Sequence, residues 1–200
     1  MDPSRGLKDR VIVVTGGCGD IGGATTRKLA ALDARVVLFD ILPADEGRPR
    51  ARDLGAVDYQ RVDQGDGAEV EAGLAATARH FGRLDVVIGN AALGSRGGIA
   101  DLTAADWERS FRVNVFGCAL LGKAAVRLMR EQDPDADGIR GKLLFTSSWV
   151  GSFPRPGAID YCVSKAAVNH LVRQVAQEEA AHGIRVNAVA PGILDAGLTR

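Results

Sequence analysis

Tyr161 and Lys165 stand four positions apart in the segment YCVSK. If this segment is helical, the two side chains share a face about one turn, or roughly 6 Å, apart. In a free peptide the phenol ionises near pH ~10 and the lysine near ~10.4, so neither is a useful base at neutral pH. A fixed ammonium beside the phenol would lower the pKa of Tyr161 and suit it to proton transfer. The pair alone also fits an ordinary half-buried tyrosine beside a solvated lysine.

A glycine-rich segment, TGGCGDIGG at 15–23, follows the first apolar run and leads into a helical pattern. Glycines allow a tight turn and let a pyrophosphate approach backbone N–H groups at the positive end of a helix. Its position between a strand and a helix predicts a dinucleotide-binding loop. The loop residues expected at the cofactor are Gly16, Cys18, Gly19, Asp20, Ile21 and Gly22.

Polar residues also follow the next three apolar runs, at the edge of the sheet where ligands bind in such folds. Asp40 can accept hydrogen bonds from both ribose hydroxyls of an adenosine and would repel a 2′-phosphate. Ile41 follows it, and the glycine loop holds no arginine or lysine, so NAD is favoured over NADP. Asp63 can hydrogen-bond an adenine amine, and Asn90 can brace the backbone near the cofactor. Taken alone, Asp40 also fits a solvated residue at a strand end.

The elements that must position these residues alternate along the chain. Short apolar runs rich in Val and Ile are separated by longer segments with helical spacing. Strands that are apolar almost throughout are buried on both faces, as in a parallel sheet between two layers of helices. We expect one α/β domain over residues 1–200, a doubly wound Rossmann-like sheet of strand order 3-2-1-4-5-6. The expected strands are 11–15, 35–40, 56–62, 84–90, 142–148 and 184–190.

The order of these motifs, from about residue 8 to the end, resembles the short-chain dehydrogenase/reductase family. The family's Thr-Gly-x-x-x-Gly-x-Gly is matched by Thr15, Gly16 and Gly22, with Asp20 in place of the middle glycine. Its Asn-Asn-Ala-Gly after the fourth strand keeps only the central Asn90 and Ala91. The later matches are Asn114 in NVFG, Ser148 thirteen residues before the tyrosine, Tyr161 with Lys165, and Arg185 to Gly192 for Arg-Val-Asn-x-x-x-Pro-Gly.

The resemblance implies an NAD-dependent oxidoreductase that acts on a secondary alcohol or ketone. Tyr161 would be the general acid or base, and Lys165 would lower its pKa and bind the nicotinamide ribose. Ser148 would hold the substrate oxygen, and Asn114 would support a water that links Lys165 to solvent. Ala91, Pro191 and Ile193 are further expected cofactor contacts. We expect the fifth strand to end at Ser148 and the next helix to start near Asp160, at one end of the sheet.

Two departures from the family pattern bear on this reading. Asp20 would weaken pyrophosphate binding if it pointed inward, but pointing outward it is a favourable charge at a helix N-terminus, and we favour the outward position. The family usually continues well past the Pro-Gly pair. The resemblance therefore implies that C-terminal elements are absent from this chain, as in a trimmed chain or a shortened relative with impaired turnover.

Composition limits the other classes of function. Twenty-five basic and twenty-five acidic residues cancel without a basic stripe, so neither nucleic acid nor an anionic membrane is an expected partner. Three cysteines in no disulfide or metal spacing, and no signal peptide, indicate a cytoplasmic protein with free thiols. His80, His170 and His182 are not grouped, so no metal site is expected.

Three functions remain open from the sequence. The leading one is the NAD-dependent dehydrogenase, and an NADPH-dependent carbonyl reductase is disfavoured by Asp40. A catalytically silent nucleotide-binding relative is disfavoured by the complete set of Ser148, Tyr161 and Lys165. A homodimer or homotetramer is expected, with the helices of Asn114 and Tyr161 at a two-fold axis. The apolar face of 110–129 would suit that contact, although burial against its own sheet would explain the same face.

Overall fold

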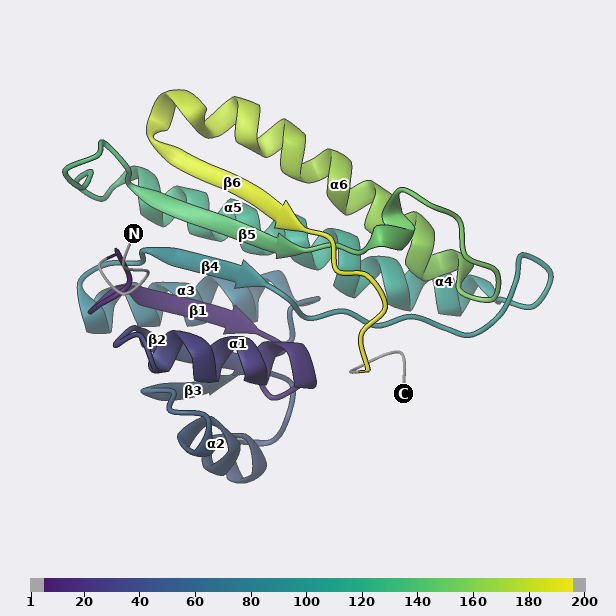
Figure 1. Ribbon diagram of the computed structural model, residues 1–200, viewed down its shortest axis with the longest axis horizontal. Coiled ribbons are helices and arrows are strands. Elements are labelled where there is room, and N and C mark those ends of the chain that lie inside the picture. The colour runs from purple at the N-terminus through teal and green to yellow at the C-terminus, as the bar shows by residue number, and fades with distance from the viewer. Residues whose placement is uncertain (1–5, 196–200) are drawn as a thin grey trace.

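The computed structural model describes residues 6–195, which form a six-stranded sheet of order β3-β2-β1-β4-β5-β6 (Figure 1). Every neighbouring pair of strands is parallel. The doubly wound fold class and the strand order expected from the sequence are therefore confirmed. The strands are β1 (Val11–Thr15), β2 (Arg35–Asp40), β3 (Asp58–Arg61), β4 (Val86–Gly89), β5 (Gly141–Thr146) and β6 (Ile184–Val189).

Helices connect successive strands and cover the sheet. None of those within residues 6–195 combines the length and the apolar character needed to cross a bilayer. The α-helices are α1 (Asp20–Ala30), α2 (Ala44–Asp53), α3 (Gly67–Phe81), α4 (Ala104–Phe111), α5 (Gly117–Arg130) and α6 (Ile159–Glu179). A π-helical turn, η2 (Arg112–Phe116), joins α4 to α5, and η3 (Trp149–Gly151) and η4 (Ala180–His182) are 3₁₀ turns.

The two faces of the sheet are packed differently. On one face, side chains of α3, α5 and α6 such as Leu74, Leu121 and Val168 form a core with Phe39 and Phe145, all at most 2% exposed. On the other face, α1 and α2 cover the half formed by β1, β2 and β3. The central strands are therefore buried on both sides, which explains their continuous apolar runs.

Strand β6 departs from the expectation of burial on both faces. Ile184 and Val186 are buried, but Arg185 between them and Asn187 after them are exposed. Among the described residues, no helix covers this second face beyond β4, and β6 forms the edge of the sheet. The first four residues of the strand therefore alternate as a half-buried strand does, and its last two residues are exposed.

The fifth strand is shorter than predicted, and this changes the setting of Ser148. Strand β5 ends at Thr146 rather than at Ser148. The Ser147 N–H still donates to the Val189 carbonyl at 2.8 Å, but Ser148 then caps η3, and its hydroxyl accepts from Val150 N at 3.5 Å. The catalytic serine expected at a strand end is thus the first residue of a turn. The following helix begins at Ile159, beside the predicted start at Asp160.

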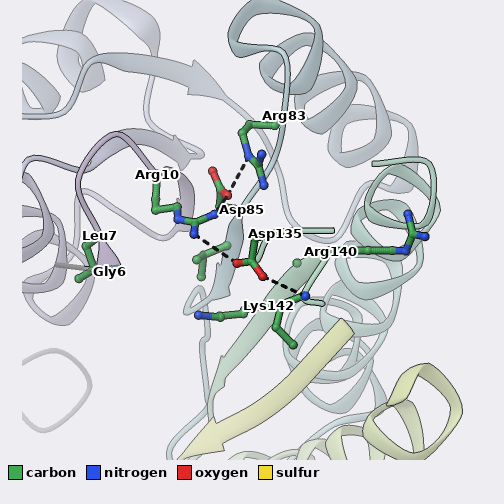
Figure 2. Close-up of a pocket in the computed structure, with 11 residues that line it drawn as sticks. Gly6, Leu7, Arg10, Arg83, Asp85, Asp135, Arg140 and Lys142 are labelled. Atoms are coloured by element: carbon green, nitrogen blue, oxygen red, sulfur yellow. Dashed lines mark hydrogen bonds and ion pairs between the residues drawn. The ribbon is translucent and has the colours of Figure 1, made fainter. Parts of the chain in front are cut away.

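The amino ends of the strands are closed by an ion-pair network around Asp85, drawn in Figure 2. The Asp85 carboxylate is nearly buried, accepts from Val11 N at 2.8 Å and pairs with Arg10 at 2.7 Å and Arg83 at 2.8 Å. Arg10 also reaches Asp135 at 3.2 Å. The small cavity of about 50 Å³ beside these residues lies at the amino ends of the strands and is unrelated to the polar residues at their carboxyl ends.

Replacing Asp85 by alanine is expected to lower the free energy of unfolding by roughly 3 kcal/mol. The substitution leaves a buried N–H and the Arg83 guanidinium without this acceptor, while Arg10 keeps Asp135, and the cost is moderated because both arginines are about one-third exposed. Urea unfolding followed by circular dichroism measures it. Glu71→Ala, which removes an exposed ion pair with Arg127, should cost under about 1 kcal/mol. Equal losses in the two variants would contradict the structural role of Asp85.

Candidate active site

Lys165 is a fully buried cation at the carboxyl end of β5. Only 1% of the residue is exposed, and its Nζ donates to the Thr146 carbonyl at 2.6 Å. Burial lowers the pKa of this lysine below its ordinary value, because the apolar surroundings disfavour the charged form. The Nζ atom lies 5.4 Å from the centre of the Tyr161 ring, so the helical pairing of Tyr161 and Lys165 on one face is present.

Tyr161 is partly buried, and the direction of its pKa differs from the expectation. Burial raises the pKa of the phenol above its ordinary value, with a smaller rise from Cys162, while a hydrogen bond with Ser148 acts to lower it. The lowering expected from Lys165 is not among these causes, and the Lys165 Nζ donates to a main-chain carbonyl instead. The Ser148 side chain is thus near enough to Tyr161 to act on its pKa, and the catalytic role predicted for the two residues stays a prediction.

Asn114 lies in the π-helical turn and is fully buried. Its amide clamps the backbone of Leu93, accepting from the N–H at 2.9 Å and donating to the carbonyl at 2.7 Å. It also donates to the Ser164 hydroxyl at 2.9 Å, next to Lys165. The side chain therefore fixes the loop after β4 to α6. The role predicted for Asn114 in holding a water stays a prediction.

The glycine loop has the shape that a dinucleotide requires. Gly16 has φ +60, a backbone conformation that favours glycine, and a Cβ on Gly22 would lie 2.2 Å from the Gly16 carbonyl oxygen. No side chain caps the N-terminus of α1 at Gly19, so a bound anion has access to the first N–H groups of the helix. Asp20 is exposed in that first turn, and Ile21 is half-buried.

Asp40 faces the glycine loop, as expected for a residue that binds the adenosine ribose. Its carboxylate accepts from Cys18 N at 2.9 Å and from Leu42 N at 3.3 Å, which leaves further lone pairs on both oxygens. Burial and the Asp40 charge raise the pKa of the Cys18 thiol to about 11, so this cysteine stays protonated. Ile41 is 63% exposed beside the carboxylate.

Asp63 is more heavily engaged than the sequence suggested. One carboxylate oxygen accepts from Gly65 N at 2.8 Å, and the other pairs with Arg112 at 2.9 Å. Burial alone would raise the pKa of Asp63, but these two partners lower it overall. An adenine amine would share this carboxylate with Arg112, which comes from the same turn as Asn114.

Sequence reasoning missed the residue that ties these loops together, Gln64. The Thr15 hydroxyl accepts from Asn90 N at 2.9 Å and Ala91 N at 3.1 Å and donates its own proton to the Gln64 amide oxygen at 2.5 Å. The Gln64 amide nitrogen then donates to the carbonyls of Ala91 at 3.2 Å and Val113 at 3.0 Å. The one signal in the sequence for this role was the position of Gln64 directly after Asp63, which follows the third strand. The hydrogen-bond partners of Gln64 lie far away in the sequence.

Asn90 braces the backbone near the glycine loop, as predicted. Its amide donates to the carbonyls of Thr15 at 3.2 Å and Gly16 at 3.3 Å. The amide oxygen accepts from the Thr146 hydroxyl at 3.2 Å, so Asn90 links β1 to the residue that holds Lys165.

The segment after β6 lies against the turn of Ser148. Trp149 N donates to the Pro191 carbonyl at 3.1 Å, and Ile193 is 76% exposed. Pro191 therefore lies at the same end of the sheet as the candidate catalytic groups. Within residues 6–195, no three His, Cys, Asp or Glu side chains gather in a cluster that could hold a metal ion.

Comparisons with known proteins agree with this geometry. The short chain dehydrogenase family model matches residues 10–200. Cis-4-hydroxycyclohexanecarboxylate dehydrogenase of Sinomonas cyclohexanicum is 38% identical over 193 residues, which cover 95% of this chain and 75% of the relative. Acetoacetyl-CoA reductase of Synechocystis sp. is 34% identical, covering 98% and 76%.

Solved structures show the same fold. Levodione reductase has a TM-score of 0.87 at 31% identity, covering 96% of this chain and 74% of the other. NAD⁺-bound xylitol dehydrogenase has a TM-score of 0.87 at 28% identity, covering 97% and 74%. The chain thus spans about three quarters of the length of these proteins, and it belongs to the short chain dehydrogenase family.

Proposed function

We propose that this protein is an NAD-dependent oxidoreductase that interconverts a secondary alcohol and a ketone, with Tyr161 as the general acid or base. The observation that carries the proposal is the meeting of three groups at the carboxyl end of β5. The Ser148 side chain is near enough to the Tyr161 phenol to act on its pKa, and the Lys165 ammonium lies 5.4 Å from the tyrosine ring. The glycine loop and Asp40 supply a fitting cradle for the cofactor at the same edge of the sheet.

The residues of the chain can carry out the proton transfer. When bound, the nicotinamide cofactor accepts or supplies the hydride. In the oxidation, the Ser148 hydroxyl holds the substrate oxygen while the Tyr161 phenolate takes the proton of the alcohol. The Lys165 Nζ lies 5.4 Å from the Tyr161 ring, and its role in this step is to stabilise the phenolate when the nicotinamide cofactor is bound. In the reduction, the neutral Tyr161 phenol gives its proton to the carbonyl oxygen.

The choice of NAD rests on Asp40, whose carboxylate suits two ribose hydroxyls and repels a 2′-phosphate. The xylitol dehydrogenase with this fold is described as NAD⁺-bound. One feature favours the alternative, an NADPH-dependent carbonyl reductase. Arg50 of α2 is near enough to the Cys18 thiol to act on its pKa, so a cation is available close to the loop.

The substrate is proposed to be a small molecule with a hydroxyl or keto group. Two relatives are named a hydroxycyclohexanecarboxylate dehydrogenase and an isopiperitenol/carveol dehydrogenase, and these names support an alcohol as the substrate. We propose a homodimer or homotetramer in the cytoplasm. Phe116, at the junction of η2 and α5, is 60% exposed and available for such a contact, whereas Leu121 and Ala125 of α5 pack on the chain's own core.

Tyr161→Phe is expected to lower kcat by about 10²- to 10⁴-fold, because it removes the proton donor and acceptor while keeping the ring. The assay follows NADH formed from NAD⁺ with a panel of secondary alcohols, and NAD⁺ affinity is measured by calorimetry. NAD⁺ binding should be unchanged in the variant. Tight NAD⁺ binding by the wild-type protein without turnover of any alcohol would support the silent relative instead.

The two reaction directions should respond differently to pH. Burial raises the pKa of Tyr161, so only a small part is phenolate near pH ~7, and log(kcat/KM) for oxidation should rise with pH through the alkaline range. The reduction uses the neutral phenol and should be flat over that range. Ser148→Ala removes the side chain that acts to lower the pKa of Tyr161, so it should move the inflection to higher pH. Identical profiles in both directions would contradict Tyr161 as the titrating group.

Asp40→Ala should weaken NAD⁺ binding by about 10- to 100-fold, the worth of a charge-assisted hydrogen bond. It should improve NADP⁺ binding, because the repulsion of a 2′-phosphate is gone. Calorimetric titration with both cofactors measures the change. Asp58→Ala is the matched control. Asp58 is an exposed aspartate at the amino end of β3, away from the carboxyl ends of the strands where Asp40 lies, and its loss should change neither affinity. Wild-type protein that prefers NADP⁺ would favour the carbonyl reductase with Arg50 as a candidate phosphate ligand.

A further inference from the structure

We propose that Asp160 is a positioning residue that holds the loop 93–97 as a fixed wall against the Tyr161 side chain. This inference rests on the proposed function, in which Tyr161 transfers the proton. Asp160 precedes Tyr161 in the first turn of α6 and is completely buried. One carboxylate oxygen accepts from Ser95 N at 2.9 Å and from the hydroxyl of Ser110, itself completely buried in α4. The carboxylate thus joins three segments at a single atom.

The loop 93–97 is held at every second residue. Leu93 is clamped by Asn114, Ser95 by Asp160, and Gly97 N donates to the Gly157 carbonyl at 3.1 Å. A parallel bridge also joins Gly97 to Ala158, in front of α6. Asp160 therefore makes the middle one of these main-chain attachments, and the Ser95 hydroxyl is held as well, by Asp106 and Arg109 of α4.

Gly94 lies between the first two attachments and faces Tyr161. A Cβ built on Gly94 would lie 2.9 Å from the Tyr161 Cβ and 3.3 Å from ring atoms. The backbone of the loop therefore packs directly on the catalytic side chain, with no room for a methyl group. The position of the phenol thus depends on where the loop is held.

The second oxygen of Asp160 adds an independent observation. It is buried and makes no hydrogen bond to any residue in the described part of the chain. A buried polar atom without a partner destabilises a fold, and such atoms in native structures are rare. Stability alone does not account for a carboxylate at this place, whereas the fixed loop beside Tyr161 does.

Asp160→Ala should lower kcat by about 10- to 100-fold, the typical effect of a small misplacement of a catalytic group. Neither the glycine loop nor Asp40 contacts Asp160 in any described hydrogen bond, so the dissociation constant for NAD⁺ should stay the same. Asp160→Asn keeps an oxygen for Ser95 and Ser110 and should restore most of the activity. Gly94→Ala should lower kcat with Asp160 intact, because its methyl group presses on Tyr161.

Glu179→Ala is the matched control. Glu179 is also a buried carboxylate of α6, but it lies at the far end and pairs with Arg130. Its loss should destabilise the fold and leave kcat unchanged. Equal falls of kcat in the alanine variants of Asp160 and Glu179, or no fall for Asp160, would overturn the proposal.

A second readout does not need turnover. The chain has two tyrosines, and burial with nearby Asp40 raises the pKa of Tyr59 to about 12, so the ionisation of Tyr161 can be followed by ultraviolet absorbance. If the loop 93–97 is no longer held, Tyr161 becomes exposed to water. The midpoint of its ionisation should then fall toward the ordinary pKa of ~10 in Asp160→Ala, but not in Asp160→Asn or Glu179→Ala. An unchanged ionisation midpoint of Tyr161 in Asp160→Ala would overturn the proposed role of Asp160, even if the wild-type protein turns over no alcohol. A failure of the wild-type protein to turn over any alcohol would by itself overturn only the proposed function.

Discussion

The hydrogen bond from the Lys165 ammonium to the Thr146 carbonyl is the constraint on which the candidate site depends. A cation with 1% of its surface exposed is costly unless a polar partner is fixed beside it. That partner is the last residue of β5, and the chain turns into η3 after Ser148. Helix α6 must then return along the same end of the sheet, which brings Tyr161 to Ser148.

A second set of hydrogen bonds keeps the cofactor side and the catalytic side in one arrangement. The Thr15 hydroxyl has both lone pairs and its proton engaged, and this dictates that the Gln64 oxygen faces it and the Gln64 nitrogen faces the π-helical turn. Asn114 belongs to that turn, and Asn90 joins β1 to Thr146, the residue that accepts the hydrogen bond of Lys165. A shift of the glycine loop would therefore also displace the surroundings of Lys165.

The parts of this structure that follow from local pattern could be predicted from the sequence. Continuous apolar runs indicated a parallel sheet, and the carboxyl ends of its strands indicated where Asp40, Asn90 and Tyr161 lie. The misses share another cause. The end of β5 before Ser148 depends on a turn, and the raised pKa of Tyr161 depends on burial, which the spacing to Lys165 does not encode.

Long-range partners account for the remaining residues whose surroundings the sequence did not reveal. Asp63 looked free for an adenine amine because its partner Arg112 lies 49 positions away, and Gln64 and Asp160 bond residues equally remote. These three side chains share a property that periodicity cannot report: each is a polar group at the carboxyl end of the sheet that joins loops from different strands. At the amino end, the carboxylate of Asp85 is fully paired with cations and an N–H group. Within residues 6–195, the buried side-chain oxygen without a partner belongs to Asp160, the residue before Tyr161, for which the proton transfer is proposed.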